Sequence, residues 1–188
     1  MNEIDLLRGV LDKTGDIVAN VEPEQLGLPT PCAEYDVADL RNHIVGWVQV
    51  FEAGCHDRAF EGDPGAYECG DDAGAVFRSA GDSLVAGWDE FGLDREVKVS
   101  SGAAMPGSMV FNMTVMEYLT HGWDLATATG QPIPYTDEEA SEVLQRARVT
   151  LPPEFQGDGQ SFGAVIPVPD DARPIDQLMG FMGRPPTT

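Results

Sequence analysis

Residues 105–130 form a long apolar segment, and this segment constrains the fold of the chain more than any other feature. Its polar residues recur at helical spacing, since His121 follows Glu117 by four positions and Asp124 follows His121 by three. At about 100° per residue, the three side chains lie within about 60° of one another around a helix. The segment therefore predicts a long helix that ends at Gly130 and carries one polar face.

A glutamate and a histidine one helical turn apart can bind the same cation, because side chains at i and i+4 are neighbours on a helix. The same spacing also suits an ion pair or a hydrogen-bonded pair inside a helical bundle, so Glu117 and His121 alone leave both interpretations open. Asp124 is either a group that orients a metal ligand from outside the ligand set or an ordinary carboxylate of the helix surface.

A second inward histidine strengthens the metal interpretation. His43 lies three residues after Leu40 and four before Trp47, so it shares the apolar stripe of its own helix. A hydrogen-bonded core histidine would explain this position without a metal. Two inward histidines and a carboxylate would instead form a His2Glu ligand set, which leaves an open coordination position in catalytic zinc sites. His43, Glu117 and His121 are therefore the candidate metal ligands.

Apolar residues at spacings of three and four predict further helices on both sides of the long segment. They cover residues 3–20, 37–51, 75–91, 137–150 and 175–182. Asp36 and Thr136 stand where N-caps are expected, and Pro106 suits the first turn of the long helix. Residues 26–32 contain two prolines and predict an extended connector over the first helix, and residues 95–100 predict a short extended segment. The chain is expected to be all-α, as a single domain over residues 1–188 in which residues 153–188 form an ordered tail packed on the bundle.

The composition excludes several classes of partner. The chain has 32 acidic and 11 basic residues and a formal net charge of −21. Such a surface repels a phosphate backbone and an anionic membrane, so neither nucleic acid nor a lipid surface is an expected partner. No apolar run approaches the roughly 20 residues that span a bilayer. The acidic start is unlike a signal peptide, and a cytoplasmic location is expected.

The three cysteines predict reduced thiols instead of a disulfide framework. Cys32, Cys55 and Cys69 are odd in number and contain no C-x2-C pair. Cys55 and His56 with Cys69 match no zinc spacing, and His56 is expected to be a surface residue. Trp47 and Trp123 either line a pocket or pack in the core.

Four motifs together are typical of a known family. They are PTPCAEYDV at residues 29–37, NHIVG at 42–46, EYLTHGWDLA at 117–126 and FGAVIPVP at 162–169. The chain resembles actinobacterial metal-binding proteins related to the N-terminal domain of mycothiol-dependent maleylpyruvate isomerase, in the DinB-like superfamily. The resemblance covers nearly the whole chain. It implies a DinB-like four-helix bundle with an added short helix and an irregular C-terminal tail, which holds a divalent metal, zinc or nickel, at the positions of His43, Glu117 and His121.

The resemblance also implies a thiol-dependent S-transferase or isomerase. A low-molecular-weight thiol such as mycothiol would occupy the open metal position as cosubstrate, and the metal would deprotonate it for attack on a small electrophile. The isomerase itself has a second α/β domain, so maleylpyruvate is not the expected substrate here. Arg41 and Arg78 are the cations that the sequence offers to an anionic substrate.

Two alternatives to an enzyme stay open. One is a non-catalytic metal- or thiol-binding protein with a sensor or sequestering role. The other is a bundle in which the three polar residues have only structural roles. A homodimer is common among bundles of this kind and is one option for the assembly.

Overall fold

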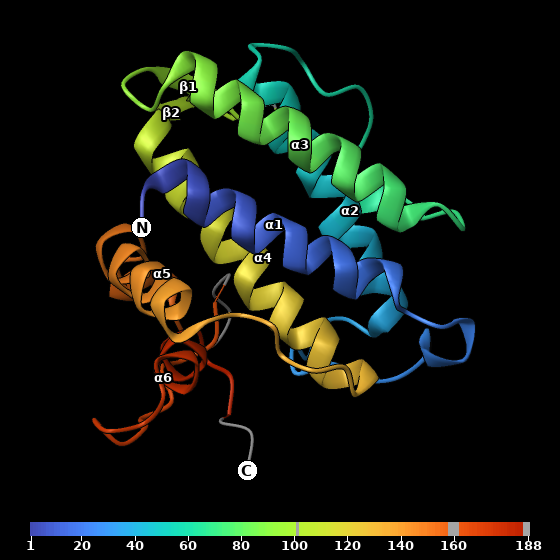
Figure 1. Ribbon diagram of the computed structural model, residues 1–188, viewed down its shortest axis with the longest axis vertical. Helices are drawn as coiled ribbons and strands as arrows, with labels where there is room; N and C mark the ends of the chain where they lie inside the picture. The colour runs from blue at the N-terminus through green and yellow to red at the C-terminus, as the bar shows by residue number, and fades with distance from the viewer. Residues whose placement is uncertain (101, 158–161, 186–188) are drawn as a thin grey trace.

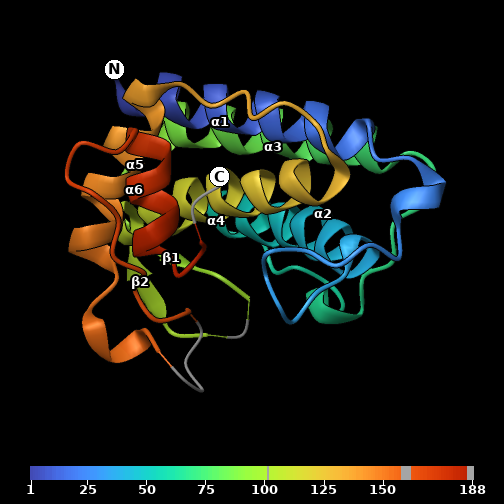
Figure 2. The same ribbon diagram turned by 90° about the horizontal axis from the view of Figure 1, so that it is seen from below.

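Four long helices form the centre of the computed structural model, which describes residues 1–100, 102–157 and 162–185. They are α1 (Glu3–Ala19), α2 (Val37–Cys55), α3 (Ala73–Phe91) and α4 (Gly107–Thr129). Helices α1 and α2 each pack against both α3 and α4, which closes the four into a bundle (Figure 1). Figure 2 shows the two layers, with α1 and α3 on one side of α2 and α4. The predicted all-α class is confirmed.

Local signals set the ends of these helices. The Asp36 side chain accepts a hydrogen bond from the Asp39 N–H at 2.9 Å and caps α2, as the sequence predicts. Thr136 and Glu139 form the capping box of α5 (Asp137–Thr150). Gly130 ends α4 with a φ of 68°, in the left-handed region that favours glycine.

Helix α4 is apolar nearly all round because it packs against several elements at once: α1, α2, α5 and the two strands described below. Tyr118 is fully buried between the rings of Phe51 and Phe77, at centroid distances of 6.1 and 5.5 Å, in edge-to-face contacts. Trp123 is also buried in the core. These aromatic contacts fix the turns of α4 that carry Glu117 and His121.

A short hairpin precedes α4 and corrects one prediction. Strand β1 (Glu96–Lys98) pairs antiparallel with β2 (Ala104–Pro106), and Val97 lies opposite Met105. The extended segment at residues 95–100 is thus confirmed, but placing Pro106 in the first helical turn was wrong. Pro106 has an extended ψ of 133° and is the residue before the helix, because Met105 continues the strand that covers buried Val97. Ser101 of the predicted turn lies outside the described residues.

The C-terminal region adds two helices at one end of the bundle. Helix α5 packs on α4, and α6 (Pro174–Phe181) packs on α5 (Figure 2). The short helix expected at residues 175–182 is therefore confirmed within one residue at each end. The irregular segment before α6 is tied to it, since the Ile166 N–H donates to the Gly180 carbonyl at 2.8 Å. Residues 158–161 and 186–188 of the predicted tail lie outside the described residues. The single-domain interpretation stays a prediction.

Three single turns of 3-10 helix complete the described elements: η1 (Pro23–Gln25), η2 (Pro64–Ala66) and η3 (Pro153–Phe155). None of the helices in the described ranges is long and apolar enough to cross a membrane.

Candidate metal centre

His43, Glu117 and His121 meet between α2 and α4. The Glu117 Oε1 atom lies 2.6 Å from His43 Nε2 and 3.7 Å from His121 Nε2. One ligand atom from each residue falls within 4.8 Å of the other two. Around a tetrahedral zinc with bonds near 2.0–2.2 Å, neighbouring ligand atoms stand about 3.3–3.5 Å apart. The three side chains therefore come close to the spacing of a metal ligand set, and small side-chain movements would complete it.

The second nitrogen of each histidine is held by an oxygen atom. The Tyr35 hydroxyl lies 3.3 Å from His43 Nδ1, and the Asp124 carboxylate lies 3.0 Å from His121 Nδ1. These contacts turn both Nε2 atoms toward Glu117, which is how partners outside the ligand set orient metal-binding histidines. Asp124 is fully buried, so the interpretation as a carboxylate of the helix surface is wrong.

Arg184 is a site residue that the sequence did not reveal. It follows α6, and its Nη2 atom donates to Asp124 Oδ2 at 2.8 Å while its Nε atom lies 3.2 Å from Oδ1. Arg184 is 7% exposed, and its Nη1 atom donates to the Met182 carbonyl. The C-terminal segment thus buries a cation against the carboxylate that holds His121. No local signal predicts this pair, because the two residues are 60 positions apart.

A cavity of about 590 Å³ opens on the three polar side chains. It is lined by residues of four segments: the connector after η1, α2, α4 and the C-terminal region. Trp47 lines it, whereas the buried Trp123 does not. The last two residues of the predicted connector, Pro31 and Cys32, form a wall of this cavity together with residues 33–35. Thr30 shapes that wall, since its hydroxyl lies 2.9 Å from the carbonyls of both Cys32 and Tyr35.

Comparison with known proteins identifies the family. The family model described as mycothiol maleylpyruvate isomerase N-terminal domain matches residues 7–126. An uncharacterized protein of Mycobacterium tuberculosis, found in strains CDC 1551 and H37Rv, is 34% identical over 179 residues, which are 92% of each chain. The chain belongs to this family. The membership predicted from the four sequence motifs is therefore confirmed.

Solved structures support the same fold. The crystal structure of the mycothiol-dependent maleylpyruvate isomerase superposes with a TM-score of 0.55 at 14% identity, over 86% of this chain and 72% of that one. A histidine-to-alanine mutant of the same enzyme gives a TM-score of 0.57 at 15% identity, over the same shares of the two chains. At this identity the likeness shows the fold alone, and it confirms the DinB-like bundle for this family member.

The electrostatics of the candidate site favour a positive charge among His43, Glu117 and His121. The desolvating surroundings of Glu117 raise its pKa, but the charge of His121 and the hydrogen bond from His43 outweigh this effect and lower the pKa to about 2. Burial lowers the pKa of His121, but the carboxylates of Glu117 and Asp124 outweigh it and raise the pKa. Glu117 is therefore an anion at neutral pH, next to an imidazole that attracts a proton.

The cations expected from the sequence lie elsewhere. Arg41 donates to the Gly70 carbonyl at 3.2 Å, and Arg78 pairs with Asp16 at 2.6 Å. Neither residue lines the cavity of the site. Of the arginines and lysines in the described residues, Arg184 is the one that lines this cavity.

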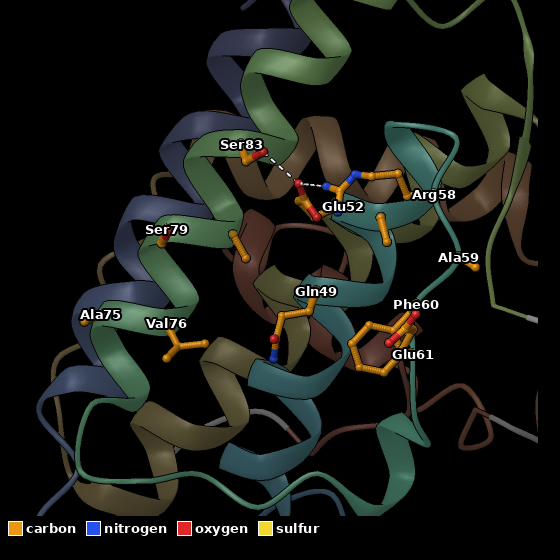
Figure 3. Close-up of a pocket in the computed structure, with 12 residues that line it drawn as sticks. Gln49, Glu52, Arg58, Ala59, Phe60, Glu61, Ala75, Val76, Ser79 and Ser83 are labelled. Atoms are coloured by element: carbon orange, nitrogen blue, oxygen red, sulfur yellow. Dashed lines mark hydrogen bonds and ion pairs between the residues drawn. The ribbon is translucent and has the colours of Figure 1, made fainter.

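A second cavity, of about 670 Å³, lies between α2, α3 and residues 58–61 (Figure 3). Glu52 points into it and is paired with Arg58 and with Ser83. His56, expected at the surface, is half-buried beside this cavity, and its Nε2 atom lies 3.1 Å from the Ser83 carbonyl. The candidate metal clusters found in the described parts of the chain do not include Cys55, His56 or Cys69.

Proposed function

We propose that this protein binds a divalent metal ion, zinc or nickel, through His43, Glu117 and His121, and that it is a thiol-dependent S-transferase or isomerase. Mycothiol is the proposed thiol, and a small electrophile is the second substrate. One observation carries the proposal: two imidazole nitrogens and a carboxylate oxygen lie within 4.8 Å of one another at the wall of a 590 Å³ cavity. Membership in a family named for a mycothiol enzyme supports the choice of thiol.

The residues present fit a divalent ion. Two imidazoles and one carboxylate suit zinc, and nickel also accepts imidazole ligands. The Tyr35 and Asp124 oxygens hold the far side of each imidazole, and Glu117 supplies the negative charge. Three protein ligands leave a coordination position for a thiol or water.

Each protein group has a separate part in the proposed chemistry. The ion, when bound, would lower the pKa of a coordinated thiol so that the thiolate forms near neutral pH. Asp124 keeps the His121 Nδ1 atom protonated and the Nε2 lone pair directed at the ligand cluster, and Arg184 holds Asp124 in place. Trp47, Met116 and Phe162 give the cavity apolar walls that limit the access of water to the thiolate.

Metal content and turnover test the proposal in two steps. Elemental analysis of protein purified without chelator is expected to give close to one ion per chain. Less than about 0.2 per chain, with no rise on adding zinc or nickel, would contradict the metal site. The zinc-loaded protein is then incubated with mycothiol and chlorodinitrobenzene, and the S-conjugate is measured. Turnover that disappears in His43→Ala supports the enzyme.

One observation favours the non-catalytic alternative. Arg184, the cation in the described part of the cavity wall, is already paired with Asp124, so it is not free to bind an anionic electrophile. Tight binding of mycothiol to the zinc-loaded protein without turnover of several electrophiles would support a thiol-binding or sequestering role.

A further inference from the structure

Cys32 brings a thiol of the protein itself to the proposed metal cavity. Its Sγ atom, a ring nitrogen of His121 and a carboxylate oxygen of Asp124 lie within 4.8 Å of one another. Cys32 is half-buried and lines the cavity. Its backbone is held by Thr30, whose hydroxyl accepts from the Cys32 N–H at 3.1 Å and donates to the Cys32 carbonyl at 2.9 Å. The thiol therefore has a fixed place at the edge of the ligand cluster.

The other two thiols lie in different environments. Cys55 is fully buried, and burial raises its pKa to about 12. Cys69 is half-buried, its Sγ atom lies 3.5 Å from the Arg41 carbonyl, and it does not line the cavity. Cys32 is thus the cysteine that a small molecule in this cavity would meet.

A second observation in the same wall points to a ligand. Thr120 is 2% exposed, and its hydroxyl has no hydrogen-bond partner among the described residues. Buried hydroxyls nearly always have a partner, because an unmade hydrogen bond is costly. Thr120 lines the same cavity as Cys32. The hydroxyl oxygen is closed to solvent in this structure, so a polar molecule in the cavity becomes its partner when the Thr120 side chain turns toward it. A cavity of 590 Å³ falls in the range of small-molecule sites.

We propose that Cys32 is a thiolation site that closes the metal cavity. It exchanges with the disulfide of a low-molecular-weight thiol: a bond forms between Cys32 Sγ and one sulfur, the disulfide bond breaks, and the second sulfur leaves as free thiol with the proton of Cys32. Cys32 is oxidised and half of the disulfide is reduced, so no other oxidant is needed. The bound half fills the space in front of His121 and Glu117, and excess free thiol reverses the reaction.

The effect of the adduct rests on the proposed function, because the adduct blocks the binding of the metal ion and its thiol. The exchange reaction itself needs no metal. Burial raises the pKa of Cys32, although the charge of Arg184 opposes this effect. We expect exchange over minutes to hours, the usual range for uncatalysed disulfide exchange.

The test uses the reduced, metal-free, full-length protein incubated with mycothiol disulfide and analysed by intact-protein mass spectrometry. We expect one adduct per chain, which Cys32→Ser removes and the matched control Cys69→Ser retains. Thermal melting of both variants checks that they fold. No adduct on the native protein, or an adduct mapped to Cys69, would overturn the proposal.

The closing of the cavity is measured separately, by zinc competition with a chromogenic chelator. The adduct is expected to weaken zinc binding at least tenfold, and dithiothreitol is expected to restore it. Unchanged zinc affinity of the modified protein would overturn the closing role. If the unmodified protein binds no zinc, the proposed function fails, whereas the mass measurement still decides whether Cys32 is the thiolation site.

Discussion

Two cavities flank α2, and each contains a glutamate. The two glutamates differ in the groups that surround their carboxylates. In the cavity between α2 and α3, Glu52 is paired with Arg58 and accepts from the Ser83 hydroxyl at 2.7 Å (Figure 3). In the cavity between α2 and α4, Glu117 faces the Nε2 atoms of His43 and His121. The first carboxylate has a cation supplied by its own chain. The second carboxylate lies beside two imidazole nitrogens, which could bind an added metal ion together with it.

Volume does not distinguish the two cavities, which measure about 670 Å³ around Glu52 and about 590 Å³ around Glu117. The histidines separate them. His56 Nε2 donates to the Ser83 carbonyl, so that ring nitrogen is bound to the backbone. His121 uses Nδ1 for Asp124 and keeps Nε2 for the cluster. Converging ligand atoms, and not empty space, distinguish the proposed metal site from the other cavity.

The largest expected effect concerns the two arginines, one in each cavity. Arg184→Met leaves the buried Asp124 without its cation, and breaking a buried pair costs about 3–5 kcal/mol of unfolding free energy. Arg58→Met removes a pair whose arginine is 57% exposed, and it should cost less than about 1 kcal/mol. Urea denaturation followed by circular dichroism measures both. Equal losses of unfolding free energy in the two variants would show that the Arg184–Asp124 pair does not stabilise the protein more than the exposed pair does.

The next effect is on zinc affinity. His43→Ala removes one ligand and should weaken binding about 100- to 1,000-fold, since structural zinc sites gain about 10–16 kcal/mol from four ligands. His56→Ala is the matched control from the other cavity and should leave the affinity unchanged. Competition with a chromogenic chelator measures both constants. A comparable loss in His56→Ala would place the metal elsewhere.

A smaller loss of affinity is expected when only the orientation of His121 changes. Asp124→Asn keeps the shape of the side chain but removes the negative charge that holds the His121 Nδ1–H, and such changes outside the ligand set typically weaken metal binding about 10- to 100-fold. Glu52→Gln serves as the control from the α2–α3 cavity. If Asp124→Asn binds zinc like the unchanged protein, Asp124 has no orienting role.

The smallest effect is a pH dependence of the metal-free protein. The pKa of His121 is raised, so its contribution to stability is complete below about 6.5, the pKa in the unfolded chain, and is lost as the pH rises through the folded pKa. The lowered pKa of Glu117 gives a contribution that is present above about 4.3 and is lost as the pH falls toward 2. Melting temperatures from pH 2 to 9 test this. Glu117→Gln should reduce the change of melting temperature with pH in both the acidic and the neutral range, and Glu52→Gln should leave it unchanged.

The helices and their ends were largely predictable from the sequence because their causes are local. Apolar spacing defines α1 to α6, and residues such as Asp36, Gly130 and Thr136 end or begin a helix through contacts a few positions away. The spacing of Glu117 and His121 fixed their common face for the same reason. Pro106 was misplaced because its conformation depends on a strand partner ten residues earlier, Glu96.

The amino-acid sequence by itself determined which residues form helices and which polar side chains share the inner faces of those helices, since both follow from the geometry of one helical turn. The tertiary structure alone decided that Arg184 neutralises Asp124, that residues 31–35 form a cavity wall, and that Cys32 lies beside His121. Arg184 and Asp124 are 60 positions apart, and Cys32 and His121 are 89 apart. Packing brings such segments together, and no local periodicity encodes which ones will meet.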